Sequence, residues 1–339
     1  MKHLTSYLLH RGLRSAMLFM LVLATLSSSL WSQSSKPAPA NAANSKEPIK
    51  PIPLELKLDT RKVALGRKLF HDPQLSGDNT VSCASCHALD TGGVDRQTFS
   101  KGIKGAAGDI NAPTVFNSVF NFKQFWDGRA ETLEDQAGGP VTNEKEMGAK
   151  WDDVLQKLRA SPGYVAQFKE VFPDGIQIAR VKEAIAEFER SLVTPNSRMD
   201  KFLRGNETAL NAEEQSGYKK FKHYGCASCH QGVNVGGNMF ETLGAVQDYF
   251  AERGNVTKAD YGRFNVTGKE EDRYVFKVPS LRNVALTGPY FHDGSAKTLE
   301  DAVQVMTKHQ LGRPMPEEDV RLIVKFLNTL TGEYNGRPL

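Results

Sequence analysis

Cysteine is scarce in this sequence, and an excess of either charge is missing. Only four of the 339 residues are cysteines, and 43 Lys and Arg stand against 39 Asp and Glu. Four cysteines in a chain of this length do not form the dense disulfide framework of a small secreted domain. The near-balanced charge, with no basic run interleaved with aromatic residues, argues against a nucleic-acid-binding protein. The length is sufficient for two domains of ordinary size.

Long hydrophobic runs are also missing, except near the N-terminus. The apolar run 16–24 follows basic residues such as Lys2 and Arg11, a pattern typical of a secretory signal. The run is short for a membrane span, although an uncleaved anchor remains the alternative. We therefore expect residues 1–32 to be a signal peptide or N-terminal anchor. Residues 33–53 are rich in Pro, Ala and Ser and are expected to form a flexible linker.

The four cysteines lie in two identical motifs. Both read Cys-Ala-Ser-Cys-His, at 83–87 and at 226–230, and Cys-x-x-Cys-His is the haem c attachment motif. Two thiols at this spacing form thioethers with the two vinyl groups of one porphyrin, and the adjacent histidine supplies an axial nitrogen to the iron. We predict two covalent haem c groups, held by Cys83, Cys86 and His87 and by Cys226, Cys229 and His230.

Other uses of paired cysteines fit this spacing less well. Structural zinc would need two pairs about 15–20 residues apart, whereas 139 residues (87–225) separate Cys86 from Cys226. A redox-active dithiol does not require a histidine after it in both copies. No cysteine is left over, which suits an oxidising compartment outside the cytoplasm.

The two motifs belong to an internal duplication. Matching blocks at a constant offset of 166 follow each motif: 113–117 with 279–283, 125–128 with 291–294, and 132–135 with 298–301. The pattern of apolar residues is mostly helical. We predict a mainly α fold of two tandem cytochrome c-like domains, 54–195 and 196–339, each with one covalently bound haem c.

Several helices can be placed from periodicity and capping residues. Thr132 and Thr298 resemble N-caps of equivalent helices. The other predicted helices are Arg61 to Phe70, Trp151 to Arg159, Ala179 to Leu192, Ala212 to His223, and Pro316 to Leu330 capped by Gly332.

The copies differ where a second iron ligand is needed. Met306 follows the repeated block of the second copy, and a thioether is a soft ligand that raises the potential of a haem iron. Its counterpart in the first copy is Pro140, which cannot bind iron. The second iron can therefore be closed by His230 and Met306 while the first stays open. Met239 and Met315 are rival ligands, and Met306 as core packing is the plain alternative.

Polar residues cluster in the first copy instead, at Gln136, Glu144 and Glu146. An open iron beside a carboxylate suits peroxide cleavage, because a proton must leave one oxygen and reach the other. The alternative is that all three are surface residues of a loop. Trp126, whose counterpart is His292, either carries electrons between haems or packs against one of them.

With these residues in view, the sequence resembles the bacterial dihaem cytochrome c peroxidase family from about Leu54 to Gly332. The resemblance rests on both haem motifs and on the segments Leu69 to Ser76, Gly92 to Asp95, Asn111 to Thr114, Gln124 to Arg129, Phe276 to Pro279 and Tyr290 to Gly294. It implies a periplasmic cytochrome-c peroxidase, usually a homodimer. Such an enzyme reduces hydrogen peroxide to water with electrons from a small cytochrome c or a cupredoxin.

The resemblance also implies individual roles. His87 would ligate the low-potential, peroxidatic haem, and His230 with Met306 the high-potential, electron-transfer haem. Glu146 would be the catalytic acid–base with Gln136 as its distal partner.

Two further roles concern the space between the haems. Trp126 would bridge the haems, and Asn111, Thr287 and Pro289 would hold one calcium ion between the domains.

One position departs from the family pattern. Many members carry a distal histidine on the loop that here runs from Ser100 to Thr114, and its place is taken by Ile103, which cannot bind iron. We expect the first haem to be open without prior reduction; Lys104 is a weaker substitute ligand. Two other functions stay open: a related dihaem oxidase acting on tryptophan of a partner protein, which would carry tyrosine in place of Met306, and a non-catalytic dihaem electron carrier.

Overall fold

The structure is a computed structural model that describes residues 46–339. The expected signal peptide or anchor at 1–32 and most of the expected linker lie outside these residues. Within them the fold is mainly helical, as predicted, with a few two- and three-residue strands. In residues 46–339, no helix combines the length and apolar character needed to cross a membrane.

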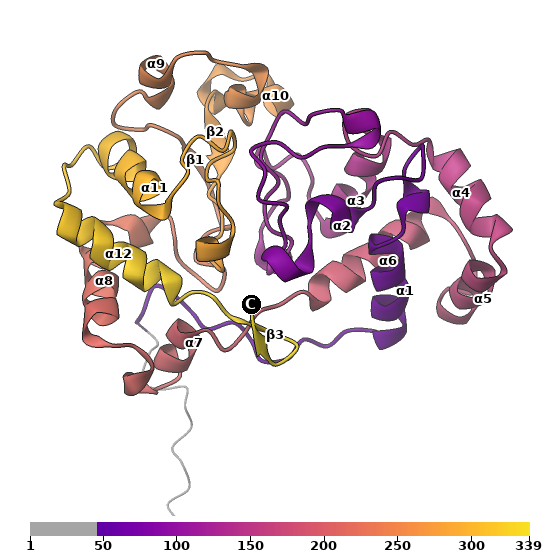
Figure 1. Ribbon diagram of the computed structural model, residues 1–339, viewed down its shortest axis with the longest axis horizontal. Helices are drawn as coiled ribbons and strands as arrows, with labels where there is room; N and C mark the ends of the chain where they lie inside the picture. The colour runs from indigo at the N-terminus through magenta and orange to yellow at the C-terminus, as the bar shows by residue number, and fades with distance from the viewer. Residues whose placement is uncertain (1–45) are drawn as a thin grey trace, which may run out of the picture. The chain divides into compact units, whose positions relative to one another are not determined.

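The elements divide between two halves; in Figure 1 the colour runs from indigo to pink in the first and from salmon through orange to yellow in the second. The first half contains α1 (Thr60–Phe70), α2 (Cys83–Cys86), α3 (Leu133–Thr142), α4 (Trp151–Ala160), α5 (Pro162–Val171) and α6 (Ile178–Ser191). The second contains α7 (Arg198–Leu203), α8 (Ala212–His223), α9 (Tyr249–Arg253), α10 (Phe264–Thr267), α11 (Leu299–Val305) and α12 (Glu317–Asn328). Two antiparallel pairs complete it, β1 (Phe240–Thr242) with β2 (Val275–Lys277), and β3 (Glu333–Tyr334) with β4 (Arg337–Pro338).

The core of each half is built on a close crossing of two helices, and the two crossings are equivalent. An added Cβ at Gly66 of α1 would lie 1.8 Å from the carbonyl oxygen of Ala184 in α6. At Gly217 of α8 the same atom would lie 2.0 Å from the carbonyl oxygen of Leu322 in α12. Only glycine permits such an approach of two helix backbones, so the duplication seen in the sequence is a duplication of this crossing.

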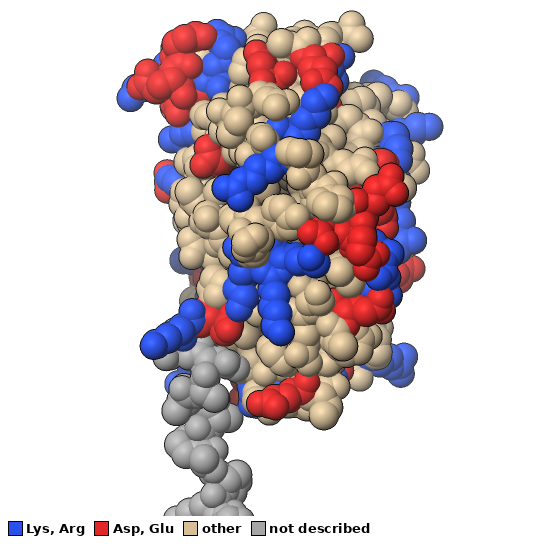
Figure 2. Space-filling view, turned by 90° about the vertical axis from the view of Figure 1, so that its left-hand side faces the viewer, with Lys and Arg blue, Asp and Glu red and all other residues tan. Residues whose placement is uncertain are grey.

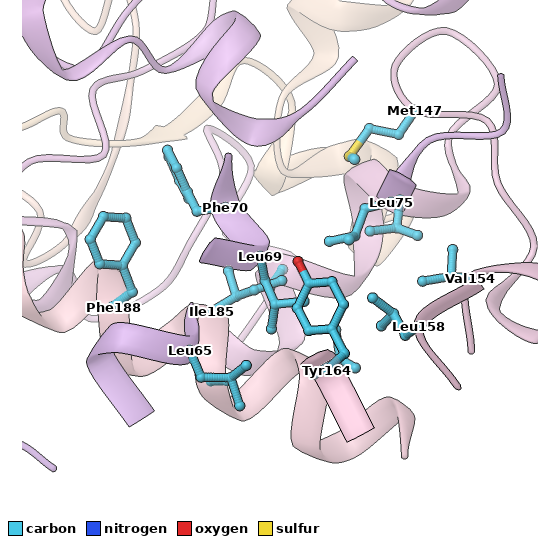
Figure 3. Close-up of a cluster of buried hydrophobic side chains, with 14 of the residues drawn as sticks. Leu65, Leu69, Phe70, Leu75, Met147, Val154, Leu158, Tyr164, Ile185 and Phe188 are labelled. Carbon is cyan, nitrogen blue, oxygen red and sulfur yellow. The ribbon is translucent and has the colours of Figure 1, made fainter. Parts of the chain in front are cut away.

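The first half packs its apolar side chains around this crossing (Figure 3). Leu65, Leu69 and Phe70 of α1 meet Ile185 and Phe188 of α6, and all five are at most 2% exposed. Burial of this kind is the main stabilising term of the half. The second half has its own cluster of buried side chains, contributed mainly by α7, α8 and α12.

The halves join at a polar centre that repeats the same symmetry. The backbone N–H of Thr194 donates to Oδ1 of Asn117 at 2.9 Å, and that of Gly332 donates to Oδ1 of Asn283 at 3.0 Å. The side-chain amides of both asparagines also donate to Oγ1 of Thr194, at 2.8 and 3.1 Å. Asn117 and Asn283 are 166 residues apart, the offset of the repeated blocks.

The end of the expected flexible linker is a packed segment, which corrects the prediction for residues 47–53. Ile49 and Ile52 are fully buried, and Ile49 forms a β-bridge with Gly232 of the second half. Arg282 donates to the carbonyl oxygen of Lys50 at 2.8 Å. Two isoleucines among prolines thus anchor a segment whose composition alone suggested a tether.

The C-terminal end crosses to the other half. Tyr334 of β3 packs edge-on against Phe116, with ring centroids 5.1 Å apart, and contacts the core of the first half. The predicted domain boundary between residues 195 and 196 therefore separates the two helical repeats, but the C-terminal strand β3 still packs on the first half. The last helix also ends earlier than predicted, because α12 stops at Asn328 with Thr329 as its C-cap. Gly332 does not cap this helix; its backbone N–H donates to Oδ1 of Asn283.

The surface carries both charges. Figure 2, which looks onto the second half, shows basic and acidic side chains on one face. Some of them pair between helices, as Arg321 of α12 does with Glu213 of α8 at 2.8 Å. This mixture agrees with the near-balanced composition.

Candidate functional site

A cavity of about 260 Å³ lies beside the second Cys-x-x-Cys-His motif, and we call it the second cavity after that motif. Its wall includes Cys226, Cys229 and His230 from the motif, and Met306 from the helix that follows the repeated block. Residues 111–114 of the first half close another side. The structure therefore brings together the four residues predicted to hold the second haem.

Met306 is favoured over its two rivals by position. Neither Met239 nor Met315 lines the cavity, and Met315 packs instead against the core of the second half. Met306 begins a π-helical turn, Met306–Gln310, directly after α11. Such turns are rare and often occur at functional sites.

Both motif histidines are oriented as iron ligands would be. Nδ1 of His87 lies 3.3 Å from the carbonyl oxygen of Gly93, and Nδ1 of His230 lies 3.3 Å from that of Val235. Because a carbonyl oxygen only accepts, Nδ1 carries the proton and Nε2 keeps its lone pair for a metal. Burial lowers the pKa of His87 and lowers that of His230 to about 4, so both rings are neutral, as metal binding requires.

The four cysteines are half-buried free thiols. None forms a disulfide, and burial raises the pKa of Cys83 to about 12 and that of Cys226 to about 11. A redox-active pair needs a stabilised thiolate, which neither site provides. Neither motif contributes to a group of three metal-binding side chains within residues 46–339. The donor set thus fits haem attachment better than a dithiol enzyme or zinc.

In the first half, Glu146 stands near the haem motif. Its charge contributes to raising the pKa of both Cys83 and Cys86, so the carboxylate lies within electrostatic range of the two thiols. Burial raises the pKa of Glu146 itself, although the charge of Arg129 and a 2.7 Å hydrogen bond from Nδ2 of Asn143 act in the opposite direction. A carboxyl whose pKa is moved toward neutrality is suited to give and take protons.

The other two polar candidates differ in exposure. Glu144 is exposed, while Gln136 lies half-buried on α3. No hydrogen bond joins the Gln136 amide to Glu146 among residues 46–339. The structure thus singles out Glu146 from the two glutamates and leaves the role of Gln136 a prediction.

The loop with Ile103 is tied to the Glu146 loop. The Ile103 N–H donates to the carbonyl oxygen of Glu146 at 2.8 Å, and the Ile103 side chain is 9% exposed within the first core. An added Cβ at Gly148 would lie 2.3 Å from Cδ1 of Ile103. The residue at the usual histidine position is thus held by packing beside the catalytic candidate.

Trp126 lies between the halves, among the residues that line the cavity. Its Nε1 donates to the carbonyl oxygen of Asn111 at 2.9 Å, and its ring meets that of His292 edge-on at 6.3 Å. His292 lies 2.7 Å from Oδ1 of Asp260. Asp260, His292 and Asp293 are close enough to hold a metal, but Arg253 already pairs with both carboxylates, so this cluster is an ion-pair network.

The three predicted calcium residues converge on the same cavity. Asn111, Thr287 and Pro289 all line it. Nδ2 of Asn111 donates to the carbonyl oxygen of Gln97 at 2.8 Å, so its Oδ1 is the atom left for a cation. Oxygen atoms of this kind are the ligands calcium prefers.

Among the buried ionisable side chains that sequence reasoning missed, Glu189 and Lys277 affect or line the regions of the haem motifs. Glu189 of α6 is 5% exposed, and its charge contributes to raising the pKa of Cys83. Lys277 of β2 is 7% exposed and lines the second cavity. Comparing the two copies at the offset of 166 would have revealed Lys277, whose counterpart Asn111 is uncharged, whereas Glu189 has no counterpart at that offset.

Each half contains the same helical arrangement and one haem motif. These features place the chain in the class of proteins with two cytochrome c-like haem domains. Residues 60–208 match the family model described as di-haem cytochrome c peroxidase. The chain is 54% identical over 289 residues to cytochrome c peroxidase Ccp of Escherichia coli, covering 85% of this chain but 62% of that protein. It is 48% identical to cytochrome c551 peroxidase of Nitrosomonas europaea, covering 87% of each chain. The chain belongs to the bacterial dihaem cytochrome c peroxidase family.

A solved structure supports the fold. A crystal structure of a MauG-like protein associated with microbial copper homeostasis matches with a TM-score of 0.72 and 30% identity. The match covers 85% of this chain and 94% of that one. The predicted two-domain, mainly α fold is thereby confirmed.

Proposed function

We propose that this protein reduces hydrogen peroxide to water in the periplasm, with electrons from a small cytochrome c or a cupredoxin. Hydrogen peroxide takes up two electrons and two protons and gives two waters. The observation that carries the proposal is the difference between the two haem sites. Met306 lines the second cavity with His230, whereas its counterpart Pro140 lies inside α3 and offers no ligand atom.

The chemistry at the first site depends on proton transfer by Glu146. As a carboxylate Glu146 would accept a proton from one oxygen of the peroxide, and as an acid it would return that proton to the other oxygen. Moving one proton between adjacent oxygens lets the O–O bond break heterolytically. Gln136 holds the outer oxygen through its amide.

Covalently bound haem supplies the redox chemistry at both sites, with His87 as protein ligand at the first and His230 and Met306 at the second. Trp126 provides the aromatic bridge between the two halves. Its position is fixed by the 2.9 Å hydrogen bond to Asn111 and by the contact with His292. One calcium ion at Asn111, Thr287 and Pro289 would hold the same region, and the active form would be a homodimer.

The first site is proposed to be accessible in the fully oxidised protein. Ile103 stands where many family members place a distal histidine, and its side chain packs in the core of the first half. Neighbouring Lys104 is exposed. Peroxide turnover should therefore start without prior reduction.

The test is turnover of peroxide with reduced cytochrome c by Glu146→Gln and by Glu144→Gln. Glutamine keeps the size of the side chain but cannot transfer the proton. We expect turnover by Glu146→Gln to fall about 10²–10⁴-fold with both haems attached. Glu144, two residues away and exposed, serves as the matched control and should retain wild-type turnover. Wild-type turnover in Glu146→Gln would remove this residue from the mechanism.

The pH dependence of turnover gives a second test of the role of Glu146 in proton transfer. Burial raises the pKa of this carboxyl, so the carboxylate that accepts the first proton is lost at a higher pH than for an exposed glutamate. We expect kcat/KM to fall as the pH is lowered through that raised pKa, in steady-state assays. The same acid limb in Glu146→Gln would show that another group titrates.

Two other functions make different predictions. An oxidase acting on tryptophan of a partner protein would turn over peroxide poorly with cytochrome c, and a plain electron carrier would not turn it over. Met306 at the second cavity disfavours the first, and Glu146 beside the first haem motif disfavours the second.

A further inference from the structure

Lys277 is a buried lysine at the second haem cavity. It lies on β2, where it pairs with Phe240 of β1, and its backbone N–H donates to the carbonyl oxygen of Trp126 at 2.8 Å. The residue is 7% exposed and lines the cavity together with His230 and Met306. Its backbone is thus held from two sides.

The ammonium of Lys277 has no counterion within residues 46–339. No hydrogen bond or ion pair forms at its Nζ in this part of the chain. Glu241 is the only acidic residue in the described wall of the cavity, and its Oε1 accepts the N–H of Thr242 at 2.9 Å. Burial lowers the pKa of Lys277 to about 8, with no charged neighbour to offset it. A buried ammonium without an anion is strongly unfavourable, so such a group normally has a partner in the complete protein.

The duplication shows that this lysine is particular to the second site. Pro113 and Pro279 are equivalent, so Lys277 corresponds to Asn111, two residues before each proline. Asn111 is neutral and donates to the carbonyl oxygen of Gln97. If the fold of each half required a cation at this position, Asn111 would also be charged. The positive charge of Lys277 therefore serves something that is specific to the second half.

Haem itself brings the missing anion, because each haem carries two propionate carboxylates. We propose that the Lys277 ammonium binds a propionate of the haem held by His230 and Met306 and so keeps a positive charge beside that haem. An ammonium–carboxylate contact of this kind is a strong, short hydrogen bond. A fixed positive charge favours the reduced iron, which carries one positive charge fewer, and therefore raises the potential of the second haem.

The test is a spectroelectrochemical titration of the holoprotein that resolves both haems. In Lys277→Gln we expect the equilibrium of the second haem to shift about tenfold toward the oxidised form, which is ~59 mV for a one-electron couple. The first haem should not move. Lys277→Arg keeps the charge and should stay close to the wild type. Lys219→Gln removes an exposed charge of α8 and is the matched control, with neither haem affected.

The proposal is overturned if the second potential is unchanged in Lys277→Gln, if Lys219→Gln shifts it equally, or if the first haem moves instead. Should Lys277→Gln fail to retain haem, a crystal structure of the wild-type holoprotein decides. Nζ at about 2.7–2.9 Å from a propionate oxygen supports the contact, and Nζ turned away from both propionates excludes it. The inference requires the second haem and not peroxide turnover. A wild type that lacks turnover but shows the Lys277 shift would refute the proposed function alone.

Discussion

At one equivalent position the two halves carry Glu189 on α6 and Leu327 on α12. The equivalence follows from the helix crossings. Gly66 meets Ala184 and Phe188, and Gly217 meets Leu322 and Phe326, so residues of α6 correspond to residues of α12 that are 138 positions later. Leu327 lines the second cavity, and the charge of Glu189 is felt by Cys83 of the first motif.

At a second pair of equivalent positions the ionisable residue lies in the second half instead of the first. The first half has neutral Asn111 where the second has Lys277. At these two pairs of positions the first half thus carries a buried acid, Glu189, and the second half a buried base, Lys277. The difference teaches that both copies keep the same helix crossing, while a few buried side chains near the haem motifs differ between them.

Among the variants that test the difference between the two halves, the largest effect on turnover should come from giving the first iron a second protein ligand, as the second iron has. Ile103→His would offer a ligand to the first iron. If the histidine is bound nine times in ten, turnover started from the oxidised enzyme falls to about one-tenth. Pre-reduced enzyme should lose less activity. Ile103→Asn, which removes the apolar side chain without adding an imidazole, is the control, and equal losses in both variants would assign the effect to packing.

The shared frame predicts equal damage at its two crossings. Gly66→Ala and Gly217→Ala would each place Cβ within about 2 Å of a carbonyl oxygen. We expect each to lower the free energy of unfolding by about 3 kcal/mol, the upper part of the usual range for overpacking. Gly163→Ala, where the nearest atom is 3.8 Å away, should be close to neutral in the same denaturant titrations. Damage at one crossing only would show that the halves are not equivalent there.

Much of this frame can be predicted from sequence, because it depends on local patterns. The helix Ala212–His223 has the predicted bounds, and Thr132 and Thr298 cap their helices through the N–H groups of Asp135 and Asp301. The cysteine motifs and the offset of 166 are visible without any structure.

What the sequence concealed depends on contacts between distant residues. Ile49 and Ile52 lie in a proline-rich stretch, and their burial depends on contacts with distant residues, such as the β-bridge of Ile49 with Gly232. Glu189 occupies a helix that reads as amphipathic, and its burial follows from the neighbours of α6 in space. Lys277 lies in a three-residue strand too short to show an alternating pattern.

The smallest expected effect concerns the pH dependence of stability. Burial raises the pKa of Glu189 to about 8, whereas in the unfolded chain it is near 4.3. Between these values the folded protein holds a proton that the unfolded chain releases, so Glu189 makes stability fall as the pH rises through this window. The Tm of Glu189→Gln relative to wild type should therefore increase from pH 5 to pH 8 and then level off.

The control for this prediction is Glu170→Gln, at an exposed position of α5. Its Tm should follow that of the wild type at every pH. Parallel Tm curves for wild type and Glu189→Gln would mean that Glu189 is ionised in the folded protein.

The most direct measurement is the electron paramagnetic resonance and optical spectrum of the fully oxidised holoprotein. One haem should be low-spin, with histidine and methionine as its two protein ligands, and the other high-spin, with His87 as its only protein ligand. Two low-spin haems, each with protein ligands on both faces of the iron, would contradict an open first site and leave an electron carrier as the better description.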